Sequence, residues 1–260
     1  MENNVFDWHK SSQLSIVQFL LAIFIPSGVA FAGFHGVLPL LVADGLPVMI
    51  AWPTVASVML LGFVLVAVFL MHREAKGLNI SLAARMGMKK LTLKQWGLYI
   101  GIAVVALVFS ILAQSLVIPL MNVFHFTIPA YMPFFLNPGI DPMTADLSVV
   151  SPGLPLSGNY GLLLLVGITL FLNILTEELY FRAWMMPKLS RYGAWGWIMN
   201  GIFFALYHTF QIWLLPTLLV TSLFFAFIFY HSKSIWPCFA AHLVGNLFLS
   251  ILGILMLIMR

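Results

Sequence analysis

Three short polar strings interrupt the long apolar segments of this sequence. They are Glu177-Glu178-x-x-x-Arg182, Phe204-x-x-x-His208 and His242-x-x-x-Asn246. A charged group at bilayer depth costs at least about 2.5 kcal/mol, so an ionisable residue in such a segment is a candidate for function. Side chains four residues apart share one face of an α-helix. Each string therefore predicts a set of polar side chains that one helix presents to its neighbours.

A carboxylate, two imidazoles and a carboxamide together are suited to peptide hydrolysis. A carboxylate in an apolar setting can act as a general base, and a neighbouring imidazole can share the proton of a water molecule. The remaining imidazole and the carboxamide can donate hydrogen bonds to a developing oxyanion. We therefore predict a hydrolytic site, whose members are Glu177, His208, His242 and Asn246.

These four residues are predicted to lie at similar depths in the membrane. A rise of 1.5 Å per residue from the expected cytoplasmic helix ends places Glu177 roughly 16 Å deep and His208 roughly 20 Å deep. The same rise places His242 and Asn246 roughly 10 to 17 Å deep. All four can thus meet in one layer, within the cytoplasmic half of the bilayer.

The charges beside Glu177 have a structural interpretation. Glu178 and Arg182 are four residues apart, so we predict that they pair and offset each other's burial. Glu177 lies about 100° round the helix from Glu178 and has no obvious local partner. We interpret Glu178, Arg182 and Phe204 as structural support. Glu177 is then the carboxylate that is available for chemistry.

The composition excludes a soluble protein. Of the 260 residues, 62% are hydrophobic and 8% are charged, against about 25% charged in an ordinary soluble domain. Twenty charged side chains cannot cover a water-facing surface of this size, so the sequence predicts an all-α, polytopic transmembrane helical bundle. The single cysteine, Cys238, excludes a disulfide framework and a site of several cysteines. No Ser/His/Asp set, glycine-rich phosphate loop or HExxH string competes with the predicted site.

The apolar blocks predict about seven spans, or eight if the segment 126–136 inserts. A bilayer core requires roughly 20 apolar residues per helix. The stretch from Gly193 to Tyr230 is too long for one helix, and we divide it between Gln211 and Pro216, where proline disfavours a continuous helix. The predicted spans are Ile16–Val42, Val48–Met71, Trp96–Val123, Tyr160–Met186, Trp195–Ile212, Leu214–Tyr230 and Ile235–Met259.

The basic residues predict the orientation of the chain. Six of the twelve lie between the second and third spans, namely Arg73, Lys76, Arg85, Lys89, Lys90 and Lys94. The positive-inside rule makes this loop and the N-terminus cytoplasmic. Because successive spans cross the membrane in alternating directions, only one basic residue, Arg260, is then predicted on the external side. Six prolines and no basic residue between His125 and Asn159 indicate an external loop, with one short interfacial piece around 131–136.

The three strings, in this order on three hydrophobic helices, resemble the CPBP or Abi family of intramembrane endopeptidases. This family includes the eukaryotic CAAX prenyl endopeptidase, which trims prenylated proteins, and bacterial members linked to bacteriocin maturation and self-immunity. The resemblance covers roughly residues 160–250. The N-terminal half is similar only as a set of membrane spans.

The resemblance implies a role for each member of the site. The family's catalytic glutamate corresponds to Glu177, and its water-activating histidine corresponds to His208. His242 and Asn246 correspond to the oxyanion-stabilising positions. The implied reaction is hydrolysis of a peptide bond by an activated water molecule.

No cofactor is expected for this reaction. The family has been described both as metalloproteases and as glutamate-dependent proteases. If zinc were used, its ligands would be Glu177, His208 and His242. Asn246 and the lack of an HExxH helix favour activation of water without a metal.

The resemblance also implies a location and partners. We expect an integral protein of the prokaryotic plasma membrane, with its active site open towards the cytoplasmic half. The expected partners are the lipid bilayer and a membrane-bound protein or peptide with a prenylated or apolar tail; nucleic acid is not expected. Residues 1–260 are expected to form one membrane domain, with accessory spans at 1–124, an external loop at 125–159 and catalytic core helices at 160–250.

Two other classes of function use the same residues. In a proton-coupled transporter or channel, Glu177 and the two histidines would form a proton relay. In a non-catalytic immunity or scaffold protein of the same fold, they would serve only structure. The sequence contains no 20 to 50 residue internal repeat of the kind that supports a transporter.

Overall fold

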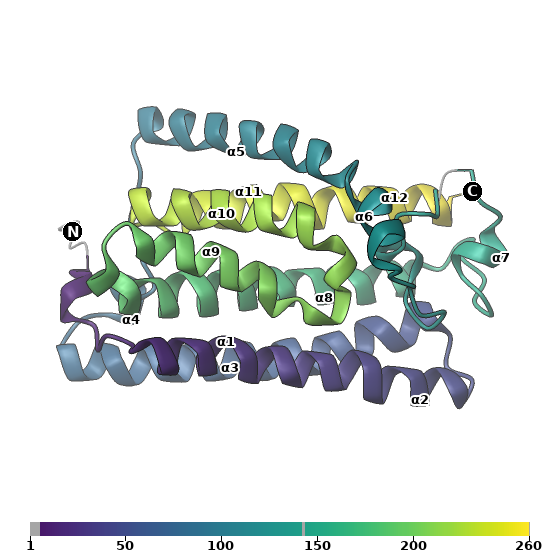
Figure 1. Ribbon diagram of the computed structural model, residues 1–260, viewed down its shortest axis with the longest axis horizontal. Helices are drawn as coiled ribbons and strands as arrows, with labels where there is room; N and C mark the ends of the chain where they lie inside the picture. The colour runs from purple at the N-terminus through teal and green to yellow at the C-terminus, as the bar shows by residue number, and fades with distance from the viewer. Residues whose placement is uncertain (1–5, 142–143, 260) are drawn as a thin grey trace.

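The structure is a computed structural model that describes residues 6–141 and 144–259. Within these ranges the chain is all-helical, which confirms the predicted fold class. Helices run lengthwise along the molecule, and the two ends of the chain lie at opposite ends of the bundle (Figure 1). Arg260, which alternation of the spans places outside, lies beyond the described residues.

Six helices in the described part of the chain are long and apolar enough to cross a membrane. Several contain π or 3₁₀ segments. The six are Ile16–Ala43 (α1 Ile16–Ala32, η2 Gly33–Val37, α2 Leu38–Ala43), Val48–Leu78 (α3), Leu93–Phe124 (α5 Leu93–Gln114, α6 Val117–Phe124), Tyr160–Tyr192 (α8 Tyr160–Thr176, η4 Glu177–Met185, η5 Met186–Tyr192), Thr209–Ser232 (η6 Thr209–Leu214, α10 Leu215–Ser232) and Trp236–Ile258 (α11 Trp236–His242, η7 Leu243–Phe248, α12 Leu249–Ile258).

The fifth predicted span, Trp195–Ile212, is a shorter helix than expected. The helix α9 covers Trp195–Tyr207, which is 13 residues and about 20 Å at 1.5 Å per residue. The helix ends because the backbone angles of His208 are no longer helical. Gln211, three residues later, also has a non-helical φ of −141°. The predicted division near Gln211 is confirmed, and the chain continues through η6 into α10.

The connecting segments contain four short helices. They are η1 (Trp8–Lys10), α4 (Leu82–Arg85), η3 (Phe134–Leu136) and α7 (Leu147–Val150). The segment around 131–136 contains only the three-residue 3₁₀ helix η3, and no membrane-spanning helix occurs there in the described chain. The prediction of seven membrane crossings therefore stands without an eighth at 126–136. Six of the seven correspond to the long helices and one to the shorter helix α9.

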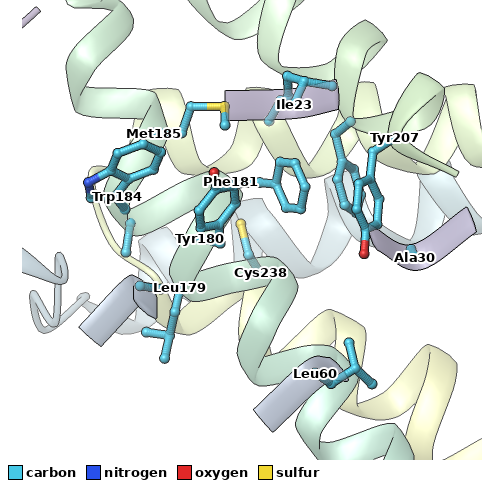
Figure 2. Packing of buried hydrophobic residues seen from close by; sticks show 14 of the residues in the cluster. Ile23, Ala30, Leu60, Leu179, Tyr180, Phe181, Trp184, Met185, Tyr207 and Cys238 are labelled. Atoms are coloured by element: carbon cyan, nitrogen blue, oxygen red, sulfur yellow. The ribbon is translucent and has the colours of Figure 1, made fainter. Parts of the chain in front are cut away.

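The interior of the bundle is dominated by aromatic and aliphatic side chains. The main packed pairs are α9 with α10, α3 with α8, and α5 with α10. In the core, Phe181 of η4 packs against Tyr207 of α9 with ring centroids 5.1 Å apart. Figure 2 shows these two rings beside Tyr180, close to Ile23 and Ala30 of α1. Helices α9 and η4 of the C-terminal half therefore pack directly on the N-terminal helices α1 and α3.

A charged cluster closes one end of the bundle. We call it the Glu74 cluster; its members are Glu74, Arg85, Lys188 and Ser11. Glu74 Oε2 pairs with Arg85 at 2.6 Å, and Glu74 Oε1 accepts from Lys188 Nζ at 2.9 Å and from Ser11 Oγ at 2.6 Å. Burial lowers the pKa of Arg85 from its ordinary value, and the adjacent carboxylate opposes this change. The cluster joins the N-terminal segment, α3, α4 and η5.

Arg85 also holds the end of η4. Its guanidinium donates to the backbone oxygen of Ala183 at 2.6 Å and to that of Trp184 at 3.1 Å. Here the π-helical segment passes into the 3₁₀ helix η5, and carbonyl groups at such a transition need donors from elsewhere. A residue of the N-terminal half thus stabilises the segment that carries Glu177.

Candidate active site

The predicted site residues all lie where helices depart from α geometry. Glu177 and Glu178 begin the π-helical segment η4, and His208 follows α9 with φ −81° and ψ 42°. His242 is the last residue of α11, and Asn246 lies in the π-helical segment η7. Such π segments are rare and occur often at functional sites. These irregular segments bring the four predicted residues together.

Glu177 lies at the centre of the site. Its Oε1 is 3.5 Å from His208 Nε2, and its Oε2 is 3.6 Å from His242 Nε2. All three side chains are at most 8% exposed. The two imidazoles therefore face the two oxygens of one buried carboxylate, at distances slightly longer than a hydrogen bond.

His208 is oriented by its own helix. Its Nδ1 lies 3.0 Å from the backbone oxygen of Phe204. A carbonyl oxygen can only accept, so Nδ1 carries the proton and, in the neutral ring, Nε2 presents a lone pair to Glu177. The Phe204-x-x-x-His208 spacing fixes the ring because the four-residue separation places the carbonyl of Phe204 below it.

Glu178 binds His242 rather than Arg182. Its Oε1 accepts from His242 Nδ1 at 3.0 Å, and His242 Nε2 lies 3.1 Å from Asn246 Nδ2, an amide donor. The predicted ion pair between Glu178 and Arg182 is wrong for two reasons. The segment has i→i+5 rather than i→i+4 bonds, and a histidine from a distant helix donates to one oxygen of the carboxylate.

Arg182 instead stacks on an aromatic ring. Its guanidinium lies over the Phe204 ring at 4.4 Å from the centroid. Within the described chain, its three nitrogens have no hydrogen-bond partner, and the side chain is fully buried. A desolvated cation–π contact is worth about 2 kcal/mol. Phe204 therefore supports the site twice, through its carbonyl for His208 and through its ring for Arg182.

Asn173 is a member of the site that the sequence analysis missed. It lies on α8, one turn before Glu177, and its Nδ2 donates to Glu177 Oε1 at 2.6 Å. Its Oδ1 accepts from Asn246 Nδ2 at 3.2 Å. The same four-residue spacing that identified the three polar strings also relates Asn173 to Glu177. Asn173 links the central carboxylate to the asparagine of η7.

The geometry of the site bears on whether it could hold zinc. Among residues 6–141 and 144–259, no three His, Cys, Asp or Glu side chains form a group that could hold a metal ion. His208 and His242 face different oxygens of Glu177, and the lone pair of His242 Nε2 already accepts from Asn246. Both imidazoles lie slightly beyond hydrogen-bond distance of the central carboxylate.

The charges of the site explain how it can handle protons. Two carboxylates and one guanidinium leave a formal charge of −1 with both histidines neutral. A proton added to His242 Nε2 would bring the site to neutrality, and the Nδ1–H donated to Glu178 would stabilise the charged ring. The site therefore contains one carboxylate that is held in a pair, Glu178, and one that faces two imidazole nitrogens, Glu177.

Comparison with known proteins identifies the same region. Residues 159–248 match the family model of the Rce1-like type II CAAX prenyl endopeptidases. This range begins at the N-cap of α8 and contains all the site residues described above. No curated protein and no solved structure matches the chain. The match confirms the predicted resemblance over these residues, to a family of prenyl endopeptidases.

Proposed function

We propose that this protein is an intramembrane endopeptidase in which Glu177 and His208 activate a water molecule. The single observation that carries the proposal is the buried Glu177 carboxylate facing two imidazole nitrogens, at 3.5 and 3.6 Å. A carboxylate with no Lys or Arg partner in the described chain can accept and return a proton, which is the task of a general base. The match of residues 159–248 supports the same class of reaction.

The proposed chemistry is a direct attack of water. Water gives one proton to Glu177 while His208 Nε2 orients it, and the water oxygen bonds to the carbonyl carbon of the substrate. His242 takes up a proton on Nε2 from the medium before the attack and keeps it throughout, so the resulting oxyanion accepts from Asn246 Nδ2 and from His242 Nε2. Glu177 then returns its proton to the leaving nitrogen, and the C–N bond breaks to give an amine and a carboxylic acid.

Glu178 has a defined role in this scheme. Its hydrogen bond to His242 Nδ1, at 3.0 Å, fixes the ring and stabilises the protonated imidazole. When His242 Nε2 carries a proton, it no longer accepts from Asn246. Both groups then become donors that can point at the same oxyanion. Glu178 thus acts as a positioning residue, in the manner of the carboxylate in a catalytic triad.

The proposed substrate is a membrane-bound protein or peptide with a prenylated or apolar tail. Three observations support it: the six apolar helices around the site, the CAAX prenyl endopeptidase match, and the burial of the catalytic groups. We propose that the end of the bundle with the Glu74 cluster is cytoplasmic, because the basic loop of residues 73–94 lies there. A prokaryotic plasma membrane is the proposed location.

Release of a fluorescent fragment from a reporter peptide tests the proposal. Purified protein in detergent is incubated with the same CAAX-type peptide in prenylated and unprenylated forms. Glu177→Ala and His208→Ala are expected to abolish release, whereas the control His125→Ala, at an exposed position, is expected to retain it. Full activity of Glu177→Ala would overturn the assignment. Proton or solute flux in liposomes without any cleavage would favour the transporter instead.

A further inference from the structure

Helix α1 is interrupted by a proline at a buried position. Pro26 lies inside α1 and has no backbone N–H, so the carbonyl of Ala22 lacks its usual donor four residues later. Tyr180 Oη donates to this carbonyl oxygen at 2.8 Å. In membrane helices, side chains of neighbouring helices often satisfy the groups that a proline frees. Because Tyr180 lies in η4, the proline gives α1 a hydrogen bond to the segment of Glu177.

The next residue, Ser27, reaches the segment of His208. Ser27 is 2% exposed. Its Oγ donates to the backbone oxygen of Tyr207 at 2.8 Å and lies 2.9 Å from Thr209 Oγ1, whose hydroxyl then donates to it. Tyr207 and Thr209 are the residues on either side of His208. The serine therefore holds both neighbours of the histidine at the point where α9 ends and carbonyls need outside donors.

A second residue of the same long helix supports the turn after His208. His35, in η2, has Nε2 at 3.0 Å from the backbone oxygen of Phe210 and Nδ1 at 2.9 Å from Tyr131 Oη. Since the carbonyl can only accept, Nε2 is the donor and Nδ1 accepts from the tyrosine. The backbone on both sides of His208 is thus held by Ile16–Ala43, a helix outside the matched residues 159–248.

We propose that the dipeptide Pro26–Ser27 of α1 positions Glu177 and His208 against each other. Pro26 acts through Tyr180, and Ser27 acts through the two neighbours of His208. One hydrogen bond ends on the Ala22 carbonyl, which Pro26 leaves free, and the other starts from Ser27 on the same helix, so the two bonds tie both catalytic segments to one rigid element and fix their separation. Figure 2 shows Tyr180 and Tyr207 on either side of Phe181, beside the α1 residues Ile23 and Ala30.

Small shifts in this separation are expected to have large effects on the rate. Glu177 Oε1 and His208 Nε2 are 3.5 Å apart, and a displacement of about 1 Å in a catalytic group can cost up to about 100-fold. The catalytic readout rests on the proposed function, whereas the positioning of the backbone does not. Hydrogen–deuterium exchange, which needs no substrate, can therefore separate the two.

Pro26→Ala separates positioning from stability. Alanine restores the N–H that competes with Tyr180 Oη for the Ala22 carbonyl, and it favours the helix. We expect kcat for the reporter to fall about tenfold, with KM within twofold and the melting temperature unchanged or higher. Tyr180→Phe should lower kcat equally, and the double variant should be no worse than either single variant. A kcat for Pro26→Ala within twofold of wild type would contradict the role of Pro26.

Ser27→Ala tests the second hydrogen bond against a matched control. Ser57→Ala removes a comparable hydrogen bond between the N-terminal half and α8, from Ser57 Oγ to Thr169 Oγ1 at 2.8 Å. This bond lies two turns from Glu177. We expect kcat to fall about tenfold in Ser27→Ala and less than twofold in Ser57→Ala. Equal losses in the two variants would overturn the role of Ser27.

Hydrogen–deuterium exchange tests the same inference without catalysis. We expect exchange of the segment 203–214 to be at least threefold faster in Ser27→Ala than in Ser57→Ala or wild type. If wild type cleaves no reporter but this difference is present, the proposed function fails and the positioning stands. If wild type cleaves the reporter and exchange of 203–214 is equal in all three proteins, the positioning fails and the proposed function stands.

Discussion

Glu74 and Glu177 are both carboxylates in membrane-spanning helices, but their partners differ in kind. Glu74 has two basic partners, Arg85 at 2.6 Å and Lys188 at 2.9 Å. Glu177 has one short bond, from the neutral amide of Asn173, and faces two imidazoles at 3.5 and 3.6 Å. Glu74 lies outside the matched residues 159–248, and Glu177 lies within them.

This difference separates a carboxylate that holds the fold from one that can react. An arginine guanidinium is not deprotonated in proteins, so Arg85 gives Glu74 a fixed counter-charge, and the Glu74 cluster joins four segments. An imidazole can gain or lose a proton near neutral pH, so Glu177 has partners with which proton transfer is feasible. We therefore expect equal substitutions at the two glutamates to have different consequences: loss of catalysis at Glu177 and loss of stability at Glu74.

The largest expected effect on the rate is that of Glu177→Gln. The amide keeps the shape but cannot accept the proton of water, so kcat should fall at least about 1,000-fold. The melting temperature should change by less than about 2 °C, because no charged partner loses its counter-charge. Reporter cleavage and differential scanning fluorimetry measure the two quantities. Activity within tenfold of wild type would remove the distinction between the two glutamates.

The next largest effect on the rate is expected from Glu178→Gln. The substitution keeps a hydrogen-bonding group beside His242 but removes the charge that stabilises its protonated form, so kcat should fall about 100-fold. KM should stay within about threefold, since the reacting groups remain. Steady-state kinetics with Arg182→Lys as a companion variant checks the assignment. If Arg182→Lys alone lowered kcat as much as Glu178→Gln does, Glu178 would act through Arg182 and not through His242.

Asn173→Ala is expected to lower kcat about tenfold. It removes the 2.6 Å bond to Glu177 and the contact with Asn246, but it leaves the reacting groups in place. Asn159→Ala is the control, because this residue caps the other end of the same helix α8. The kcat values of Asn173→Ala and Asn159→Ala, measured at equal protein concentration, show whether the loss is specific to Asn173. Equal kcat values for wild type and Asn173→Ala would make the contact incidental.

Glu74→Gln is expected to change the rate least and the stability most. Removing the charge leaves Arg85 and Lys188 without their counter-charge, which should destabilise the fold by about 3 kcal/mol. The kcat of the folded protein should remain within threefold of wild type. Thermal unfolding measures the change in stability, and steady-state kinetics below the unfolding temperature measure kcat. A loss of kcat comparable to that of Glu177→Gln would mean that the Glu74 cluster takes part in the chemistry.

No effect at all is expected from a metal chelator. The proposed reaction uses the carboxylate and imidazole groups directly, so millimolar chelator should leave reporter cleavage unchanged in wild type. Loss of activity that added zinc restores would instead assign Glu177, His208 and His242 as ligands. A known zinc protease under the same conditions serves as the control for the chelator.

The sequence predicts the spans and the four central residues of the site because these are local patterns. Hydropathy depends on neighbours in the chain, and each polar string lies within one helix. Asn173 was within reach of the same argument, since it precedes Glu177 by four residues. It carries no charge, however, and burial of an amide is a weaker signal than burial of a carboxylate.

The remaining contacts depend on segments that are far apart in the chain. The hydrogen bond from His242 to Glu178 joins residues 64 positions apart, and that from Ser27 to Tyr207 joins residues 180 positions apart. Helical periodicity contains no information on which distant helix supplies a partner. The π-helical geometry of η4 also cannot be predicted from the sequence, because the residue pattern around Glu177 fits an α-helix as well. Both facts together explain the incorrect pairing of Glu178 with Arg182.

The source of the oxygen in the first turnover tests the central claim most directly. Excess protein is mixed with the reporter in ¹⁸O-water, and the new carboxyl group is analysed by mass spectrometry after a single turnover. Direct attack by a water molecule that Glu177 activates predicts one ¹⁸O atom in the product of wild type. An unlabelled first product, with the label appearing in Glu177 instead, would show that the glutamate attacks the substrate itself and would contradict the account.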